Sequence, residues 1–119
     1  MIHRHIHLFT VTLFIATLVQ SNVSTASEQA NQWRKVNDTT LQFSGEITPE
    51  TERDFFLTFT EEIDTLIVTS PGGDLRAAVT VGIEIALRDM TVIVRKMCLS
   101  SCANYFLLAA DTKIIESGS

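Results

Sequence analysis

Two short segments contain residue types that could act together in catalysis. One is a Ser-Pro-Gly-Gly turn at residues 70–73, and the other is a Cys-Leu-Ser-Ser-Cys segment at residues 98–102. A glycine exposes its backbone N–H with no side chain in the way, and such an N–H can donate to an oxygen on which negative charge develops. A serine in a sharp turn before a helix can act as a nucleophile. Together the two segments offer a hydroxyl and backbone donors, as acyl transfer requires.

Each segment also has a simpler explanation when it is considered alone. A Pro-Gly turn can merely connect a strand to a helix, and Ser100 or Ser101 can cap the N-terminus of a helix. The catalytic interpretation therefore depends on whether the fold brings the two segments together.

The hydrophobic pattern predicts that it does. Thr40–Ile47 is expected to form a strand, and so are the unbroken apolar runs Leu66–Val68 and Val92–Val94. Unbroken runs are typical of strands that are covered on both faces, as in a parallel sheet. A helix that begins at Asp74 makes a βαβ unit of the last two strands. Their carboxyl ends then lie at one edge of the sheet, where α/β proteins carry their sites.

Further helices are expected on either side of this unit. Thr48-Pro49-Glu50 has the residue types of a helix start. The segment Cys102–Ala110 is predicted to be a helix after a turn at residues 96–101, and Lys113–Ile115 a further strand. Helical spacing assigns two sets of side chains to the core. They are Phe55, Phe56, Phe59 and Ile63 in the first helix, and Leu75, Ala78, Val79, Ala86 and Met90 in the second, broadened by Val81 and Ile85.

Both segments resemble the proteolytic subunits of the Clp proteases. Residues 66–73, followed by an Ala-rich helix, look like the central segment of these subunits, and residues 100–110 are similar to their active-serine helix. The Cys-x-Ser-x-Cys spacing resembles exported members of the same superfamily. The resemblance covers about residues 41–116 and implies an α/β fold of the Clp protease/crotonase type, a partial parallel sheet of ββα units.

The resemblance implies a role for three residues. Ser100 would be the nucleophile, and the backbone N–H groups of Gly72 and Ser101 would form the oxyanion hole. Ser101 is the alternative nucleophile, but Ser100 is favoured because Cys102 then matches the exported pattern. The family's general base is a histidine in the next βα turn, which would fall beyond Ser119, and no histidine follows His7. We therefore expect a C-terminally truncated serine peptidase that acts on peptides or proteins. The alternatives are an inactive peptide-binding module and a truncated gene product.

The two cysteines leave two alternatives open. In an oxidising compartment Cys98 and Cys102 can form a disulfide that pins the turn, or they can remain two free buried thiols. A metal site is not expected, because two cysteines without a nearby histidine do not complete a zinc shell. No cofactor is expected.

The length and charge of the chain restrict the class of protein. The 119 residues suffice for one domain, and the net charge of −5 without a basic stripe argues against a nucleic-acid partner. Residues 1–26 have the mildly basic start, apolar run and small residues of a signal peptide. The protein is thus expected to be periplasmic or secreted, or else anchored to a membrane by an uncleaved N-terminus. Residues 27–39 are expected to be a polar, loosely packed lead-in and residues 40–119 the α/β domain, which can form homo-oligomers as family members do.

Overall fold

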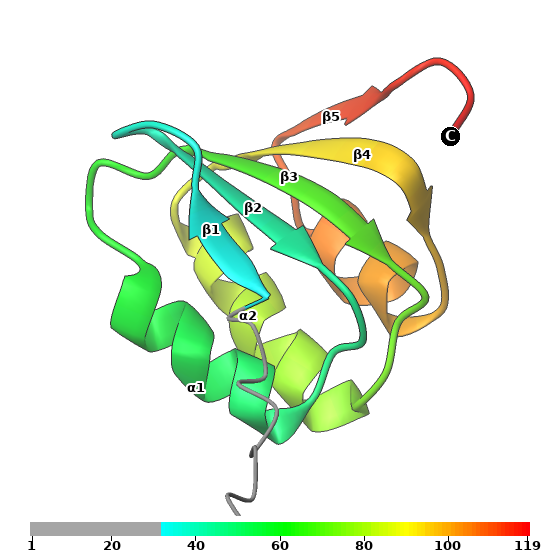
Figure 1. The fold of residues 1–119 in the computed structure, drawn as a ribbon, viewed down its shortest axis with the longest axis horizontal. Helices are drawn as coiled ribbons and strands as arrows, with labels where there is room; N and C mark the ends of the chain where they lie inside the picture. Colours follow the sequence, from blue (N-terminus) through cyan, green and yellow to red (C-terminus); the bar gives the residue numbers. More distant parts are fainter. Residues whose placement is uncertain (1–31) are drawn as a thin grey trace, which may run out of the picture.

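The computed structural model describes residues 32–119, which form an α/β domain with a five-stranded mixed sheet (Figure 1). The predicted signal peptide lies outside these residues. The elements in chain order are β1 (Trp33–Lys35), β2 (Thr40–Ser44), α1 (Pro49–Thr58), β3 (Thr65–Ser70), α2 (Leu75–Leu87), β4 (Thr91–Cys98), the π-helix η1 (Cys102–Leu107) and β5 (Thr112–Ile115).

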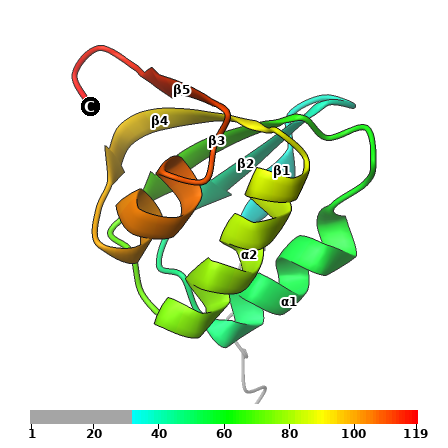
Figure 2. The ribbon, with the colours of Figure 1, turned by 180° about the vertical axis from the view of Figure 1, so that it is seen from behind.

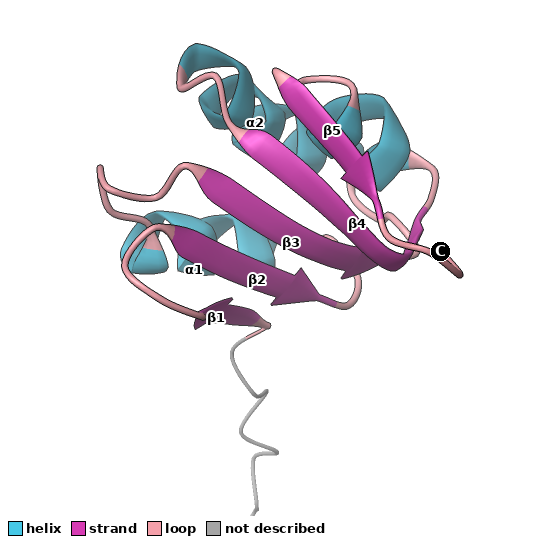
Figure 3. Cartoon of the chain, turned by 90° about the horizontal axis from the view of Figure 1, so that it is seen from above, coloured by secondary structure: helices cyan, strands magenta, loops and turns pink. Residues whose placement is uncertain are grey.

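The strands lie in the sheet in the same order as in the chain. Strands β2 to β5 are parallel to one another, and β1 pairs antiparallel with β2 at the edge. Each parallel connection steps to the next strand in the same direction, so crossovers of one hand place every helix on the same face. Figure 3 shows the three helices behind the sheet, whose other face carries no helix. The predicted α/β class is therefore confirmed.

The sequence signals for the helix starts are also confirmed. Thr48 caps α1, and its hydroxyl accepts a hydrogen bond from the Thr51 N–H, while the Thr51 hydroxyl accepts one from the Thr48 N–H. Pro49 occupies the first turn, where its missing N–H costs nothing. Asp74 caps α2 by accepting from the Ala77 N–H at 2.8 Å.

The core lies between the sheet and the helices and contains a cluster of aromatic rings. The ring centroid of Trp33 lies 4.4 Å from that of Phe43 and 4.9 Å from that of Phe55. Phe106 of η1 also belongs to this cluster, and its ring centroid lies 6.1 Å from that of Phe43. The prediction of a loosely packed lead-in is thus wrong for Trp33–Lys35, because β1 places Trp33 in the core.

The predicted buried faces of the two long helices require correction. Helix α1 ends at Thr58, so Ile63 enters the core from a loop, and Phe56 is 47% exposed. In α2 the buried face is centred on Val81 and Ile85, whereas Leu75 is 58% exposed. Ala86 is also exposed. Ala78, Val81, Ile85 and Met90 are buried as predicted, so the prediction of this face is wrong only for Leu75 and Ala86.

Three predicted boundaries also differ. The first strand ends at Ser44, and Ile47 makes only an isolated bridge with Gly73. Strand β4 continues to Cys98 and takes up half of the predicted turn at 96–101. The third helix is a six-residue π-helix and ends before Ala110. No helix among residues 32–119 is long and apolar enough to cross a membrane.

Candidate active site

The turn between β4 and η1 forms a sharp elbow at Ser100. Ser100 has φ of +51°, in the left-handed region that non-glycine residues rarely adopt. Such strain is commonly found at functional sites, where the surrounding structure holds it in place. Ser100 is exposed, and its hydroxyl makes no hydrogen bond within the described part of the chain. The elbow thus presents a serine hydroxyl at the carboxyl end of a central strand.

The Pro-Gly-Gly turn after β3 lies directly against this elbow. The Leu99 N–H donates to the Ser70 carbonyl oxygen at 3.0 Å. A Cβ at Gly72, whose φ is +96°, would lie 2.7 Å from the Leu99 carbonyl oxygen and 2.9 Å from the Ser100 Cβ. Only glycine can be accommodated at such a close approach with positive φ. The structure therefore brings together the two segments that the sequence pattern placed at one edge.

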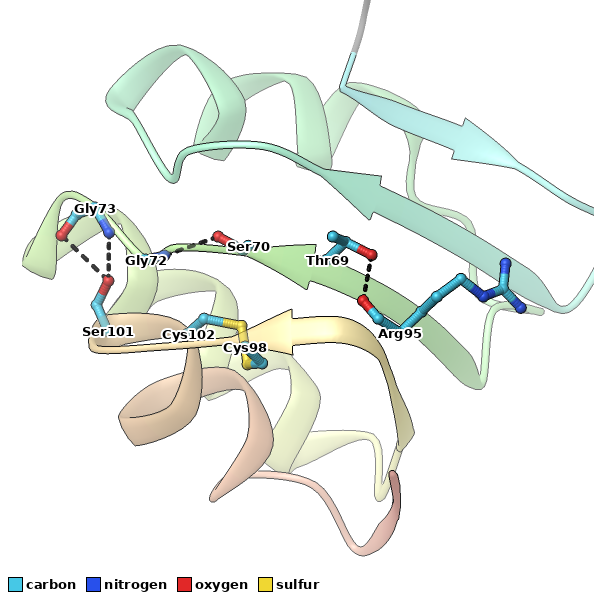
Figure 4. The surroundings of a disulfide bond; sticks show 8 residues. All are labelled: Thr69, Ser70, Gly72, Gly73, Arg95, Cys98, Ser101 and Cys102. Carbon is cyan, nitrogen blue, oxygen red and sulfur yellow. Dashed lines mark hydrogen bonds between the residues drawn. A yellow bond between two sulfur atoms is a disulfide. The ribbon is translucent and has the colours of Figure 1, made fainter. Parts of the chain in front are cut away.

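Ser101 joins the two turns through its hydroxyl. The Ser101 Oγ accepts from the Gly73 N–H at 2.8 Å and donates to the Gly73 carbonyl oxygen at 3.1 Å (Figure 4). Ser101 is only 5% exposed. Because the Ser101 hydroxyl is buried and hydrogen-bonded, Ser100 is the better candidate for a nucleophile of the two serines.

A disulfide closes the elbow and resolves the alternative that the sequence left open. Cys98, at the end of β4, is bonded to Cys102, at the start of η1, with their Cα atoms 5.2 Å apart (Figure 4). Cys102 is fully buried in the core, so the bond ties the elbow to the packed interior. The disulfide thus spans Ser100 and restricts the backbone on both sides of it.

The two predicted oxyanion donors differ in their availability. The Ser101 N–H lies at the start of the helical segment, where an N–H has no acceptor within its own helix. The Gly72 N–H donates to the Ser70 Oγ at 3.0 Å, a local serine turn of a common type. A substrate oxygen could use both donors only after the Ser70 hydroxyl turned away. The sequence analysis missed this contact, although a serine two residues before a turn glycine is a usable signal for it.

The residues that would activate Ser100 are not found beside it. Residues 32–119 contain no histidine, and no carboxylate in this range is hydrogen-bonded to the Ser100 hydroxyl. Within the same range, no group of three or more His, Cys, Asp and Glu residues is arranged to hold a metal ion. The described residues thus place an exposed serine hydroxyl beside two backbone N–H groups, with no histidine among them.

A separate pocket lies at the other end of the sheet, near the amino ends of the parallel strands. It is lined by Lys35 at the end of β1, Asp38 in the β1–β2 turn, and Thr60 and Glu62 in the loop before β3. These residues lie near the amino ends of the parallel strands, so the pocket does not adjoin the Ser100 elbow at their carboxyl ends.

Comparisons with protein-family models, curated proteins and solved structures find no match for this chain. A functional interpretation therefore depends on the geometry of the elbow and on the resemblance of the two turns.

Proposed function

We propose that this chain carries the nucleophile and oxyanion-binding part of a serine peptidase of the Clp protease/crotonase fold. The observation that carries the proposal is the left-handed Ser100, held between two joined cysteines and in contact with the Gly72 turn. A helix cap alone does not require this arrangement, because a cap serine adopts an ordinary extended backbone. The peptide or protein substrate class rests on the family resemblance.

In the proposed reaction the Ser100 Oγ attacks the carbonyl carbon of a peptide bond. The carbonyl oxygen becomes negative and accepts hydrogen bonds from the Ser101 N–H and, once Ser70 rotates, from the Gly72 N–H. A base from outside residues 32–119 takes the Ser100 proton and passes it to the leaving amine as the C–N bond breaks. Water then attacks the acyl-serine, releases the acid and restores the Ser100 hydroxyl.

The absence of a histidine in residues 32–119 suggests a test by chemical rescue. Imidazole, supplied in solution, can act as a small diffusible base for a serine that lacks one. We expect the full chain to react slowly with a fluorophosphonate probe and several-fold faster when imidazole is added. Mass spectrometry of the digested protein should locate the adduct on Ser100.

Two serine variants make this test specific. Ser100→Ala should abolish the imidazole-dependent labelling, whereas Ser44→Ala, at an exposed serine of β2, should leave it unchanged. Labelling that is independent of imidazole and equal in wild type and Ser100→Ala would refute the proposal.

The second candidate function is a peptide-binding module without catalysis. It is favoured by the Ser70 hydroxyl, which already satisfies the Gly72 N–H and leaves fewer donors for a developing charge. This alternative predicts that short peptides bind equally well to wild type and Ser100→Ala, while neither is labelled with or without imidazole. Calorimetric titration with peptides can be run on the same samples.

Export of the chain is part of the same proposal. The disulfide Cys98–Cys102 supports an oxidising compartment, where such bonds persist. Cleavage after Ala26 would be seen as a new N-terminus in the protein recovered from a periplasmic or culture fraction.

A further inference from the structure

The disulfide joins two residues that are already neighbours in the fold. Cys98 ends β4 and Cys102 begins η1, so the bond connects no distant elements. Figure 2 shows the orange η1 beside the end of β4, joined to it by a short loop. A disulfide stabilises a fold less when it spans a shorter stretch of chain. The contribution of this bond as a structural cross-link is therefore at the low end for a disulfide.

Hydrogen bonds and packing position both cysteines without the disulfide. Cys98 pairs with Ser70 in the ladder between β3 and β4. The Leu99 N–H donates to the Ser70 carbonyl oxygen, and the Cys102 N–H donates to the Leu99 carbonyl oxygen, each at 3.0 Å. Cys102 also lies in the hydrophobic core. The elbow can therefore keep its shape when the S–S bond opens, and the two thiols then remain close enough to close it again.

The two cysteines differ in exposure. Cys98 is half-buried, whereas Cys102 is 0% exposed. In thiol–disulfide exchange a thiolate attacks one sulfur while the other sulfur leaves, and the rate depends on access to the sulfur that is attacked. An incoming thiolate reaches Cys98 more readily than Cys102. The burial thus favours Cys98 as the sulfur that is attacked and Cys102 as the sulfur that leaves.

We propose that Cys98–Cys102 is a redox-active disulfide that exchanges with the thiols of cysteine-containing peptides. This activity is a second chemistry of the elbow. It uses neither the Ser100 hydroxyl nor the two backbone donors, so it does not depend on the peptidase proposal.

The exchange takes place in two steps. A peptide thiolate attacks the Cys98 Sγ, an S–S bond forms between the peptide and Cys98, and the Cys98–Cys102 bond breaks. Its electron pair stays on the Cys102 Sγ, which takes up a proton. A second peptide thiolate attacks the peptide sulfur of the mixed disulfide, so that a disulfide-linked peptide pair leaves and Cys98 becomes a thiol. Two peptide thiols are thereby oxidised and the protein disulfide is reduced. A small oxidised disulfide, such as oxidised glutathione, restores the bond by the reverse steps.

A redox titration of the purified full chain with glutathione, a cysteine-containing tripeptide, tests the exchange. The chain has no cysteines besides Cys98 and Cys102, so mass spectrometry after acid quenching and alkylation counts the reduced pair directly. We expect the same titration curve from the oxidised and the reduced protein, with the circular dichroism of the folded state retained throughout. A disulfide that opened only in denaturant, or whose opening abolished the folded signal, would be a structural cross-link and would overturn the proposal.

A short pulse of iodoacetamide on the reduced wild type tests the roles of the two cysteines. Cys98 should be alkylated at least about tenfold faster than Cys102, because burial makes a thiol inert. Equal rates, or faster alkylation of Cys102, would contradict the assigned roles.

Two matched variants test the same roles without alkylation. Cys102→Ala should accumulate a glutathione adduct on Cys98, since no second thiol remains to release it, whereas Cys98→Ala should form the adduct at Cys102 far more slowly. Circular dichroism should show that both variants are folded, and the pulse on the wild type gives the answer if either is not. Because none of these measurements involves Ser100, fluorophosphonate labelling can succeed or fail separately.

Discussion

The Ser101 hydroxyl connects two turns that are 28 residues apart in the chain. It satisfies both the N–H and the carbonyl oxygen of Gly73 in a partly buried position. These contacts hold the Pro-Gly-Gly turn at a fixed distance from the elbow. At the residue scale, the position of Ser100 relative to the Pro-Gly-Gly turn therefore depends on the hydroxyl of its neighbour, Ser101.

We expect Ser101→Ala to lower the free energy of unfolding by about 1–3 kcal/mol, since it leaves two backbone groups without a partner. Urea unfolding followed by circular dichroism measures this change. Ser44→Ala, at an exposed serine with no side-chain hydrogen bond in the described structure, should change stability by less than about 0.5 kcal/mol. If both substitutions changed the free energy of unfolding by the same small amount, the hydrogen bonds between the Ser101 hydroxyl and Gly73 would contribute nothing to stability.

At the scale of elements, β5 is the least covered strand of the sheet. All of its four residues are exposed, and Ile114 and Ile115 are 44% and 56% exposed. Besides the backbone pairing with β4, an ion pair ties its end to the neighbouring strand. The Arg95 Nε and Nη2 atoms donate to the two carboxylate oxygens of Glu116, each at 2.9 Å.

This ion pair should be visible in the titration of Glu116. The hydrogen bonds from Arg95 lower the pKa of the Glu116 carboxyl below its ordinary value, and they raise the pKa of Arg95. A carboxyl with a lowered folded pKa stabilises the protein above its unfolded pKa, and the contribution is lost as the pH falls through the folded pKa. Arg95→Gln should therefore raise the Glu116 pKa, as measured by carboxyl NMR shifts.

Lys113→Gln is the control for this titration, because it removes a cation from β5 without touching the pair. The Lys113 Nζ donates to the Ala110 carbonyl oxygen and not to Glu116. If Lys113→Gln raised the Glu116 pKa as much as Arg95→Gln does, the lowered pKa would be due to the overall positive charge nearby and not to the hydrogen bonds from Arg95.

Some features of the helices and strands could be predicted from the sequence, and others could not. Strands β2 to β5, the starts of α1 and α2 and the meeting of the two turns were predictable, because capping residues and apolar runs are local signals. Strand β1 was not predicted, because Trp33 is the one apolar residue in its three-residue segment. The buried face of α2 was predictable only in part. Ala78, Val81 and Ile85 are buried as predicted, but Leu75 and Ala86 are exposed, since a helix with apolar residues on most sides has little periodicity to mark the buried one. The polar residues Arg95 and Lys96 concealed the end of β4, which continues to Cys98.

The site was predictable only in part for a related reason. The positions of Ser100 and Gly72 follow from the topology of the backbone. The bond from the Gly72 N–H to Ser70, and the pairing of Cys98 with Cys102, depend on side-chain geometry that spacing leaves open. The hydrogen bonds of the Ser101 hydroxyl to Gly73 likewise depend on side-chain geometry and were not predictable from spacing.

At the scale of the whole molecule, Trp33 joins the edge of the sheet to the helix layer. It is 2% exposed, and its indole Nε1 donates to the Thr51 carbonyl oxygen of α1 at 2.7 Å. Its ring packs against Phe43 and Phe55. The edge strand β1 is short, so much of its attachment to the domain comes from this one side chain.

Trp33→Ala should therefore lower the free energy of unfolding by about 3–5 kcal/mol, the usual cost of removing a large aromatic side chain from a core. Chemical denaturation followed by far-UV circular dichroism measures it. Phe56→Ala, at an aromatic residue that is 47% exposed, should cost clearly less. A small effect of Trp33→Ala would mean that β1 is peripheral to the fold.

The short span of the disulfide has a consequence for how the site is assembled. Cys98 and Cys102 are separated by four positions in the chain. The entropy lost on closing a loop grows with its length, so these two thiols can meet before any distant part of the sheet has formed. Oxidation can thus shape the elbow early during folding, and β3 with its Pro-Gly-Gly turn would then dock onto a bend that already exists.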